Sequence, residues 1–213
     1  MSSEEKSIIT EKTARYFKKR NGSDSVKIVL FVIHGYAQLA SEFIEDFNFV
    51  NDKSTLIVAP EGLSKFYFRN KIGASWMTKE GRLSEIRDYI FFLEKVFGDV
   101  NKSYDLADAK IFLLGYSQGV HTAVRWFINS KNHFEKLILC SSDFPKDAEF
   151  DLLGEKLKHS EMIYIHGSMD EAVREEGFNE SKILLSENKI IFREIKFDGG
   201  HRIDEVSVKE AMK

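Results

Sequence analysis

Short apolar runs alternate along the chain with longer amphipathic stretches, and this alternation limits the possible folds more than any other feature. The clearest run is residues 26–33, VKIVLFVI, which is nearly continuous in β-branched and large apolar side chains. Such a run is typical of a parallel strand that helices cover on both faces. Comparable runs lie at residues 55–59, 111–114, 137–139, 162–165 and 190–195. We therefore expect an α/β fold with a mostly parallel sheet and helices on both of its faces.

Helical spacing marks the stretches between these runs. Apolar residues recur every three or four positions in residues 83–97, which is the pattern of a helix with one buried face. The same spacing predicts further helices at residues 43–49, 120–128, 178–185 and 203–212. Residues 14–19 alternate loosely between apolar and polar side chains, and this pattern predicts an edge strand ahead of the parallel set.

Length and composition indicate one globular domain. The 213 residues contain only two prolines and no repeat, so we expect residues 1–213 to form a single domain with a flexible N-terminus at residues 1–12. The net charge of −3 argues against a nucleic-acid partner, which needs a concentrated basic field. The lone Cys140 excludes an intrachain disulfide and a zinc site of several cysteines. No apolar stretch resembles a secretory signal or a membrane span, so a cytoplasmic location is the simplest interpretation.

Functional residues are expected where the strands end, because ligands of parallel sheets bind beyond the carboxyl ends of the strands. Residues 115–119, GYSQG, follow the run at 111–114 and precede a predicted helix. This is the context of a nucleophile elbow, in which a sharp, strained turn lifts a serine hydroxyl above the sheet. Glycines on both sides avoid collisions with the neighbouring strand and helix. We therefore expect Ser117 to be a catalytic nucleophile rather than an idle serine in a tight turn.

Backbone amides near Ser117 are expected to bind the oxyanion of the reaction. The amide of Gln118 follows the nucleophile at the start of a helix, where the helix dipole favours negative charge. A second amide is expected from the loop after the first buried run, where His34 and Gly35 are followed by Tyr36. We assign the second donor to Tyr36, and we expect His34 to hydrogen-bond within the loop without transferring protons.

The strand ends further along the chain supply an acid and a base. Asp170 closely follows the run at 162–165, where it could orient a histidine, although it could instead cap the next helix. Asp143, after the preceding run, is the alternative acid. Among six histidines, His201 alone follows the last run, on a glycine-rich loop that can reach Ser117.

Two further titratable residues lie close to these motifs. His121 is one helical turn beyond Ser117, where a base would lie below the nucleophile inside a helix, so we expect a structural role. Asp204 follows His201 and is expected to cap the C-terminal helix.

These motifs resemble those of the small phospholipase/carboxylesterase group of α/β hydrolases, which includes the acyl-protein thioesterases. The matching segments are His34-Gly35, GYSQG, Cys140-Ser141-Ser142 with Pro145, HGSMD at 166–170 with Val173, and Gly200-His201 with Ile203. The chain order serine, aspartate, histidine is the order expected for this fold. The resemblance implies an α/β-hydrolase fold with a minimal lid or none, and no metal or other cofactor. It places the nucleophile, acid and base at Ser117, Asp170 and His201, and the oxyanion amides at Tyr36 and Gln118.

The segment at residues 61–81 is the expected substrate region, because it follows a strand end and should lie over the same edge of the sheet. Its Phe68, Trp76 and Met77 could wall an apolar acyl pocket. The alternative is that these side chains pack the segment onto the core.

The sequence therefore predicts a serine carboxylesterase or thioesterase that hydrolyses small or medium acyl esters through an acyl-enzyme intermediate. Two other functions stay open. One is acyl transfer or peptidase action by the same residues, and the other is a non-catalytic binding protein that keeps the fold. The expected partner is a small acyl ester or thioester, without nucleic acid, and the oligomeric state is open.

Overall fold

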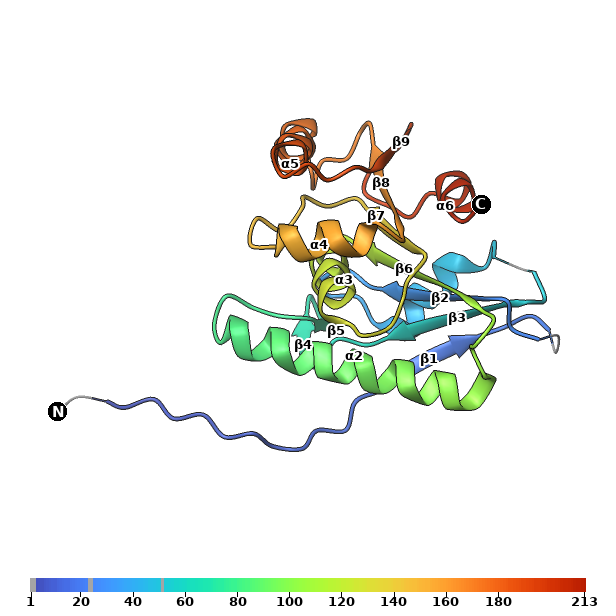
Figure 1. Ribbon diagram of the computed structural model, residues 1–213. Helices are drawn as coiled ribbons and strands as arrows, with labels where there is room; N and C mark the ends of the chain where they lie inside the picture. The colour runs from blue at the N-terminus through green and yellow to red at the C-terminus, as the bar shows by residue number, and fades with distance from the viewer. Residues whose placement is uncertain (1–2, 23–24, 51) are drawn as a thin grey trace.

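The computed structural model describes residues 3–22, 25–50 and 52–213, and a seven-stranded sheet lies at its centre (Figure 1). The strands, in spatial order, are β1 (Tyr16–Lys19), β3 (Thr55–Pro60), β2 (Ile28–Ile33), β6 (Lys110–Tyr116), β7 (Lys136–Cys140), β8 (Glu161–Gly167) and β9 (Arg193–Phe197). All neighbours from β3 to β9 pair in parallel, whereas β1 runs antiparallel to β3 at one edge. The expected parallel sheet and its N-terminal edge strand are confirmed.

Helices cover both faces of the sheet, as predicted. One face carries α2 (Arg82–Tyr104), α3 (Gln118–Asn129), α4 (Phe150–Leu157) and α5 (Glu175–Glu187), and the other carries α1 (Ala40–Phe43), the 3₁₀ helix η1 (Ile44–Phe47) and α6 (Glu205–Ala211). Alternate residues of β2 pack against the helix layers on opposite faces of the sheet. Phe31 packs into the α2–α5 layer and Leu30 into the α1–α6 layer, and both are fully buried. This two-sided burial explains the continuous apolar run of this strand.

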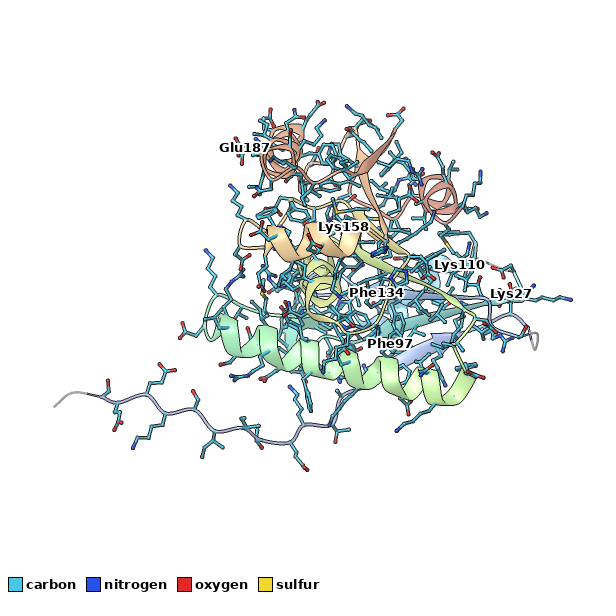
Figure 2. The ribbon with its side chains drawn as sticks, in the orientation of Figure 1. Lys27, Phe97, Lys110, Phe134, Lys158 and Glu187 are labelled. Carbon is cyan, nitrogen blue, oxygen red and sulfur yellow. The ribbon has the colours of Figure 1, made fainter. Side chains whose placement is uncertain are left out.

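Aromatic packing holds α3 against the sheet. The ring of Trp126 in α3 meets Phe31 of β2 edge-on, with centroids 5.2 Å apart. Trp126 also packs edge-on against Phe134, and Phe134 in turn meets Phe97 of α2 at 6.1 Å (Figure 2). The large contact area stabilises this layer, and it fixes the position of the turn that joins β6 to α3.

Some boundaries differ from the sequence-based expectations. The last strand begins at Arg193 rather than at residue 190, because the amide of Ile190 donates to the carbonyl of Leu185 at 2.9 Å and closes the end of α5. The helix expected at residues 43–49 is divided between α1 and η1. Helix α4 and a hairpin of β4 (Ser64–Phe68) and β5 (Lys71–Ser75) have no counterpart among the predicted elements.

The β4–β5 hairpin lies beside the loop that follows β2. Its two turn residues, Arg69 and Asn70, have φ of 47° and 64°, as a type I′ turn requires. Ala74 of β5 joins the loop through two backbone hydrogen bonds, accepting from Ala37 at 2.9 Å and donating to Gln38 at 3.2 Å. The hairpin is therefore fixed at the carboxyl end of β2, where functional residues are expected.

The N-terminal segment leads away from the body before β1 begins (Figure 1). Residues 3–14 have no regular secondary structure and are exposed; residues 1 and 2 of the expected flexible N-terminus lie outside the described residues. No helix in the described part of the chain has both the length and the apolar character needed to cross a membrane.

Candidate active site

Ser117 occupies the single position between the end of β6 and the start of α3. Its backbone has φ 52° and ψ −125°, a conformation that residues with a side chain rarely adopt. The surrounding backbone holds it there, since the Ser117 amide donates to the Cys140 carbonyl at 3.0 Å and its carbonyl accepts from Val120 at 2.9 Å. The expected strained turn between strand and helix is therefore present.

The two glycines of the GYSQG segment allow this turn to form. A Cβ at Gly119 would lie 2.1 Å from the carbonyl oxygen of Ile33, and one at Gly115 would lie 2.6 Å from the oxygen of Gly119. Both obstacles are backbone atoms, which cannot rotate away as a side chain can. Glycine is thus required on each side of Ser117 by the close packing of α3 against β2 and β6.

Asp170 and His201 are in direct contact at the carboxyl end of the sheet. Asp170 follows β8 and His201 follows β9, as the sequence predicts. The imidazole Nδ1 lies 2.9 Å from Oδ2 and 3.1 Å from Oδ1 of the carboxylate. Because an ionised carboxylate only accepts hydrogen bonds, Nδ1 carries the proton and Nε2 is left as the basic nitrogen.

The carboxylate of Asp170 is buried and held by several donors. Its side chain has 0% exposure, and Oδ1 accepts from the amides of Ala172 and Val173 at 2.9 Å each. Burial alone would raise the pKa of Asp170, but the hydrogen bonds from Val173 and His201 outweigh it and keep the pKa below its ordinary value. The ionised carboxylate therefore holds the ring of His201. The two amides that donate to it, those of Ala172 and Val173, belong to the turn before α5.

Tyr116 connects the loop of His201 to the turn of Ser117. Its hydroxyl donates to the backbone carbonyl of His201 at 3.0 Å, and the centroids of the two rings are 5.0 Å apart. Since Tyr116 directly precedes Ser117, the histidine lies next to the nucleophile turn. Among the described residues, however, no hydrogen bond joins Ser117 Oγ to His201. The structure thus pairs Asp170 with His201, and Tyr116 links the loop of His201 to the residue that precedes Ser117.

The loop that follows β2, residues 34–39, packs directly against the turn of Ser117. A Cβ at Gly35 would lie 3.1 Å from the Cβ of Ser117, so a side chain at position 35 would crowd Ser117. The amides of Tyr36 and Gln118 have no hydrogen-bond acceptor among the described residues. Both of the predicted donors are therefore available to a ligand.

His34 holds this loop from inside the protein. Its Nε2 accepts from the amide of Gly62 at 2.9 Å, so Nδ1 carries the proton and donates to the Gly35 carbonyl at 2.7 Å. Burial lowers the pKa of His34 to about 4, so the ring is neutral near pH 7. The expected hydrogen bond of His34 within the loop is confirmed.

The side chain of Gln118 ties α3 to the end of the hairpin, a contact that the sequence did not predict. Its Nε2 donates to the Met77 carbonyl at 3.0 Å, and its Oε1 accepts from the Trp76 amide at 3.2 Å. Trp76 is only 1% exposed, and its indole donates to the His34 carbonyl at 2.9 Å. Burial favours a packing role for Trp76 over a role in the wall of an acyl pocket.

Aromatic rings form a small exposed cluster beside the 34–39 loop. The ring of Tyr36, 52% exposed, stacks on Phe66 at 5.1 Å and meets Phe68 edge-on at 6.1 Å. Of the predicted substrate residues, Phe68 is thus at the surface, while Met77 is partly buried against the core. The side chain of Tyr36 was not predicted for this surface. No local signal marks the Tyr36 side chain, whereas alternation along β4 puts Phe66 and Phe68 on one face.

Asp143, the alternative acid, has a different histidine as its partner. His121 Nε2 lies 3.1 Å from both the carbonyl and the Oδ1 of Asp143, whereas His201 contacts Asp170. In the described part of the chain, no group of three or more histidine, cysteine or acidic side chains is arranged to hold a metal ion.

Solved structures of esterases and thioesterases share this fold. Esterase PE8 is 20% identical, with a TM-score of 0.71 over 93% of this chain and 99% of that one. Acyl-protein thioesterase 2 from Zea mays is 13% identical, with a TM-score of 0.69 over 93% and 96% of the two chains. The Bacillus cereus carboxylesterase is 17% identical, with a TM-score of 0.67 over 93% and 91%.

No protein-family model matches the chain, and no curated protein sequence is significantly similar to it. At identities this low, structural similarity establishes the fold. The protein has the α/β-hydrolase fold that the sequence motifs predict, and its resemblance to carboxylesterases and acyl-protein thioesterases extends to its three-dimensional structure.

Proposed function

We propose that the protein is a serine hydrolase that cleaves small or medium acyl esters or thioesters. One observation carries this proposal: the tyrosine before a strained serine at a strand-to-helix turn contacts the loop of a histidine, and Nδ1 of this histidine is hydrogen-bonded to a buried, ionised carboxylate. This combination activates serine for attack on a carbonyl. The esterases and thioesterases that share the fold support the same reaction class.

The mechanism follows from the protonation states of the site. Nε2 of His201 takes the proton of Ser117 Oγ as the oxygen attacks the acyl carbonyl, and Asp170 stabilises the imidazolium that forms. The imidazolium then gives this proton to the departing alkoxide or thiolate. Water, deprotonated by the same nitrogen, cleaves the acyl-enzyme and releases the acid. The open contact between Ser117 and His201 is expected to close when substrate binds, as it often does in hydrolases.

Negative charge on the carbonyl oxygen needs donors that do not reorient during the reaction. The free amides of Tyr36 and Gln118 are suited to this role, because both belong to backbone that packs around Ser117. Gln118 is the first residue of α3, so the helix dipole adds to its effect. Phe68 and Met77 would then border the acyl group on the hairpin side.

The decisive experiment compares the wild-type protein with Ser117→Ala. We expect the wild type to hydrolyse p-nitrophenyl acetate and to be labelled by a fluorophosphonate, with labelling abolished by boiling. Ser117→Ala should lose labelling and should lower kcat by about 10⁴-fold or more, because the covalent path is closed. Equal turnover by the two proteins would contradict the proposal, and adding alcohol or amine acceptors distinguishes hydrolysis from acyl transfer.

A further inference from the structure

Glu61 is a buried carboxylate outside the residues assigned to the reaction. It follows β3 and is 2% exposed, a position in which an ionised group is costly unless it is paired. Arg15, ahead of β1, supplies a forked pair of hydrogen bonds, with Nε 2.7 Å from Oε1 and Nη2 3.1 Å from Oε2. Lys65 of β4 adds a second cation at 3.1 Å.

The same carboxylate reaches the far end of the 34–39 loop. Its Oε2 accepts a hydrogen bond from the amide of Ala40 at 3.3 Å, directly after this loop. The next residue, Gly62, donates to His34 Nε2 at the near end of the loop. Glu61 and Gly62 therefore hold both ends of the segment that carries the Tyr36 amide.

Arg15 fixes the position of this pair of residues. Besides its fork on the carboxylate, its backbone carbonyl accepts from the Glu61 amide at 3.2 Å. Burial alone would raise the pKa of Glu61, but the hydrogen bonds from Arg15 and Lys65 outweigh it and lower the pKa. The carboxylate is thus kept ionised, in the form that can accept from Arg15 and Ala40 together.

We propose that the Arg15–Glu61 ion pair positions the 34–39 loop so that the Tyr36 amide meets the oxyanion. Both are positioning residues, since they act through the loop and do not touch the reacting atoms. This inference rests on the proposed hydrolase function. It assigns a role in catalysis to the N-terminal segment, which otherwise only adds an edge strand to the sheet.

A carboxylate with the same cation pairing elsewhere in the sheet provides the control, although its side chain is 41% exposed and that of Glu61 is 1% exposed. Glu161, at the start of β8, has Arg193 Nε at 2.7 Å and Lys136 at 3.1 Å, the same distances that Glu61 has to its own arginine and lysine. It lies at the amino end of the strand, away from the site. The control variant therefore separates the effect on kcat of losing an arginine-paired carboxylate from the effect of misplacing the 34–39 loop.

The experiment compares Glu61→Gln, Arg15→Ala, Arg15→Lys and the control Glu161→Gln with the wild type. Turnover of p-nitrophenyl acetate is normalised to the fraction of protein labelled by fluorophosphonate after exhaustive reaction, so unfolded molecules do not count. We expect Glu61→Gln and Arg15→Ala to lower this kcat about tenfold with KM within about twofold, because a misplaced oxyanion donor weakens the transition state alone. Arg15→Lys should recover part of the loss, and Glu161→Gln should stay within about twofold of the wild type.

Inhibition by phenylboronic acid gives a second readout. Its tetrahedral adduct with Ser117 places an oxygen where the oxyanion would form. Its inhibition constant should therefore rise about tenfold in Glu61→Gln and in Arg15→Ala. Unchanged kcat and unchanged inhibition would overturn the positioning role. If Glu61→Gln fails to fold, Arg15→Ala decides alone, since the Arg15 side chain is half exposed. An unlabelled, inactive wild type would instead refute the proposed function.

Discussion

The conformation of Ser117 shows how a single residue depends on its surroundings. A non-glycine residue with positive φ costs about 1–3 kcal/mol and persists only where the structure around it enforces the strain. At Ser117 the enforcement comes from α3, whose first turn approaches the end of β2 so closely that only glycine fits at position 119. The strained turn lies at the end of β6, at the same edge of the sheet as Asp170 and His201, which follow β8 and β9.

Asp170 and Asp143 provide a direct test of the acid at the residue scale. Asp170→Asn removes the acceptor that holds Nδ1 of His201, and it should lower kcat by about 10⁴-fold by favouring the wrong tautomer. Asp143→Asn should change kcat by less than about tenfold, because Asp143 contacts His121 instead. Steady-state hydrolysis of p-nitrophenyl acetate measures both. A larger effect at Asp143 than at Asp170 would reverse the assignment.

The places of the candidate site residues at the strand ends were predictable from local motifs, and the contacts between residues far apart in the chain were not. Ser117, Asp170 and His201 each follow an apolar run, so the rule that ligands bind at strand ends was enough to locate them. Glu61 and Arg15 are 46 positions apart and belong to no motif. Only the antiparallel pairing of β1 with β3 brings them together.

At the scale of secondary structure, one carboxylate joins three elements beside the site. Asp147, in the connection from β7 to α4, accepts from Arg82 of α2 and Arg125 of α3 at 2.6 Å each. Partial burial alone would raise the pKa of Asp147, but the hydrogen bonds from Arg82 and Arg125 outweigh it and lower the pKa to about 2. The ion pairs therefore persist until the solution is strongly acidic.

This shift predicts how stability depends on pH. A carboxylate whose pKa is lowered in the folded state stabilises the protein when the pH is above the pKa of the same group in the unfolded state, about 4. This contribution is lost as the pH falls toward the folded-state pKa of about 2. Asp147→Asn should lower the free energy of unfolding by about 1 kcal/mol or less near pH 7, since Asp147 is half exposed. Urea unfolding at pH 7 and pH 3 should show this difference shrinking in acid. A difference that grows in acid would contradict the ion-pair explanation.

The hairpin shows why some elements are not predictable from the sequence. Residues 64–75 mix aromatic and charged side chains, and the turn at Arg69 and Asn70 adopts positive φ without a glycine to signal it. Two-residue turns of this type are recognised mainly by glycine. The boundary of β9 was misplaced for a similar reason, because the apolar Ile190 belongs to the end of α5 rather than to the strand.

At the scale of the whole molecule, the sheet brings together residues that lie far apart in the chain. The loops after β2, β6, β8 and β9 all meet at the carboxyl end of the parallel strands, while Lys27 and Lys110 mark the opposite end (Figure 2). Because β6 is central in the sheet, helices on both faces support the turn of Ser117. The strand β1 lies at one edge of this sheet, and Arg15, directly ahead of it, contacts Glu61.

Truncation of the N-terminal segment tests this arrangement. Ile8 and Ile9 are 88% and 90% exposed, and all of the described residues 3–11 are exposed. Removing residues 1–11 should therefore change kcat and melting temperature little. Removing residues 1–15 also deletes Arg15 and should lower kcat about tenfold, as Arg15→Ala does. Both truncated proteins are measured with p-nitrophenyl acetate and by thermal unfolding. If the shorter deletion already lowers kcat, the exposed segment itself contributes to the site, and the contribution of the N-terminus begins before Arg15.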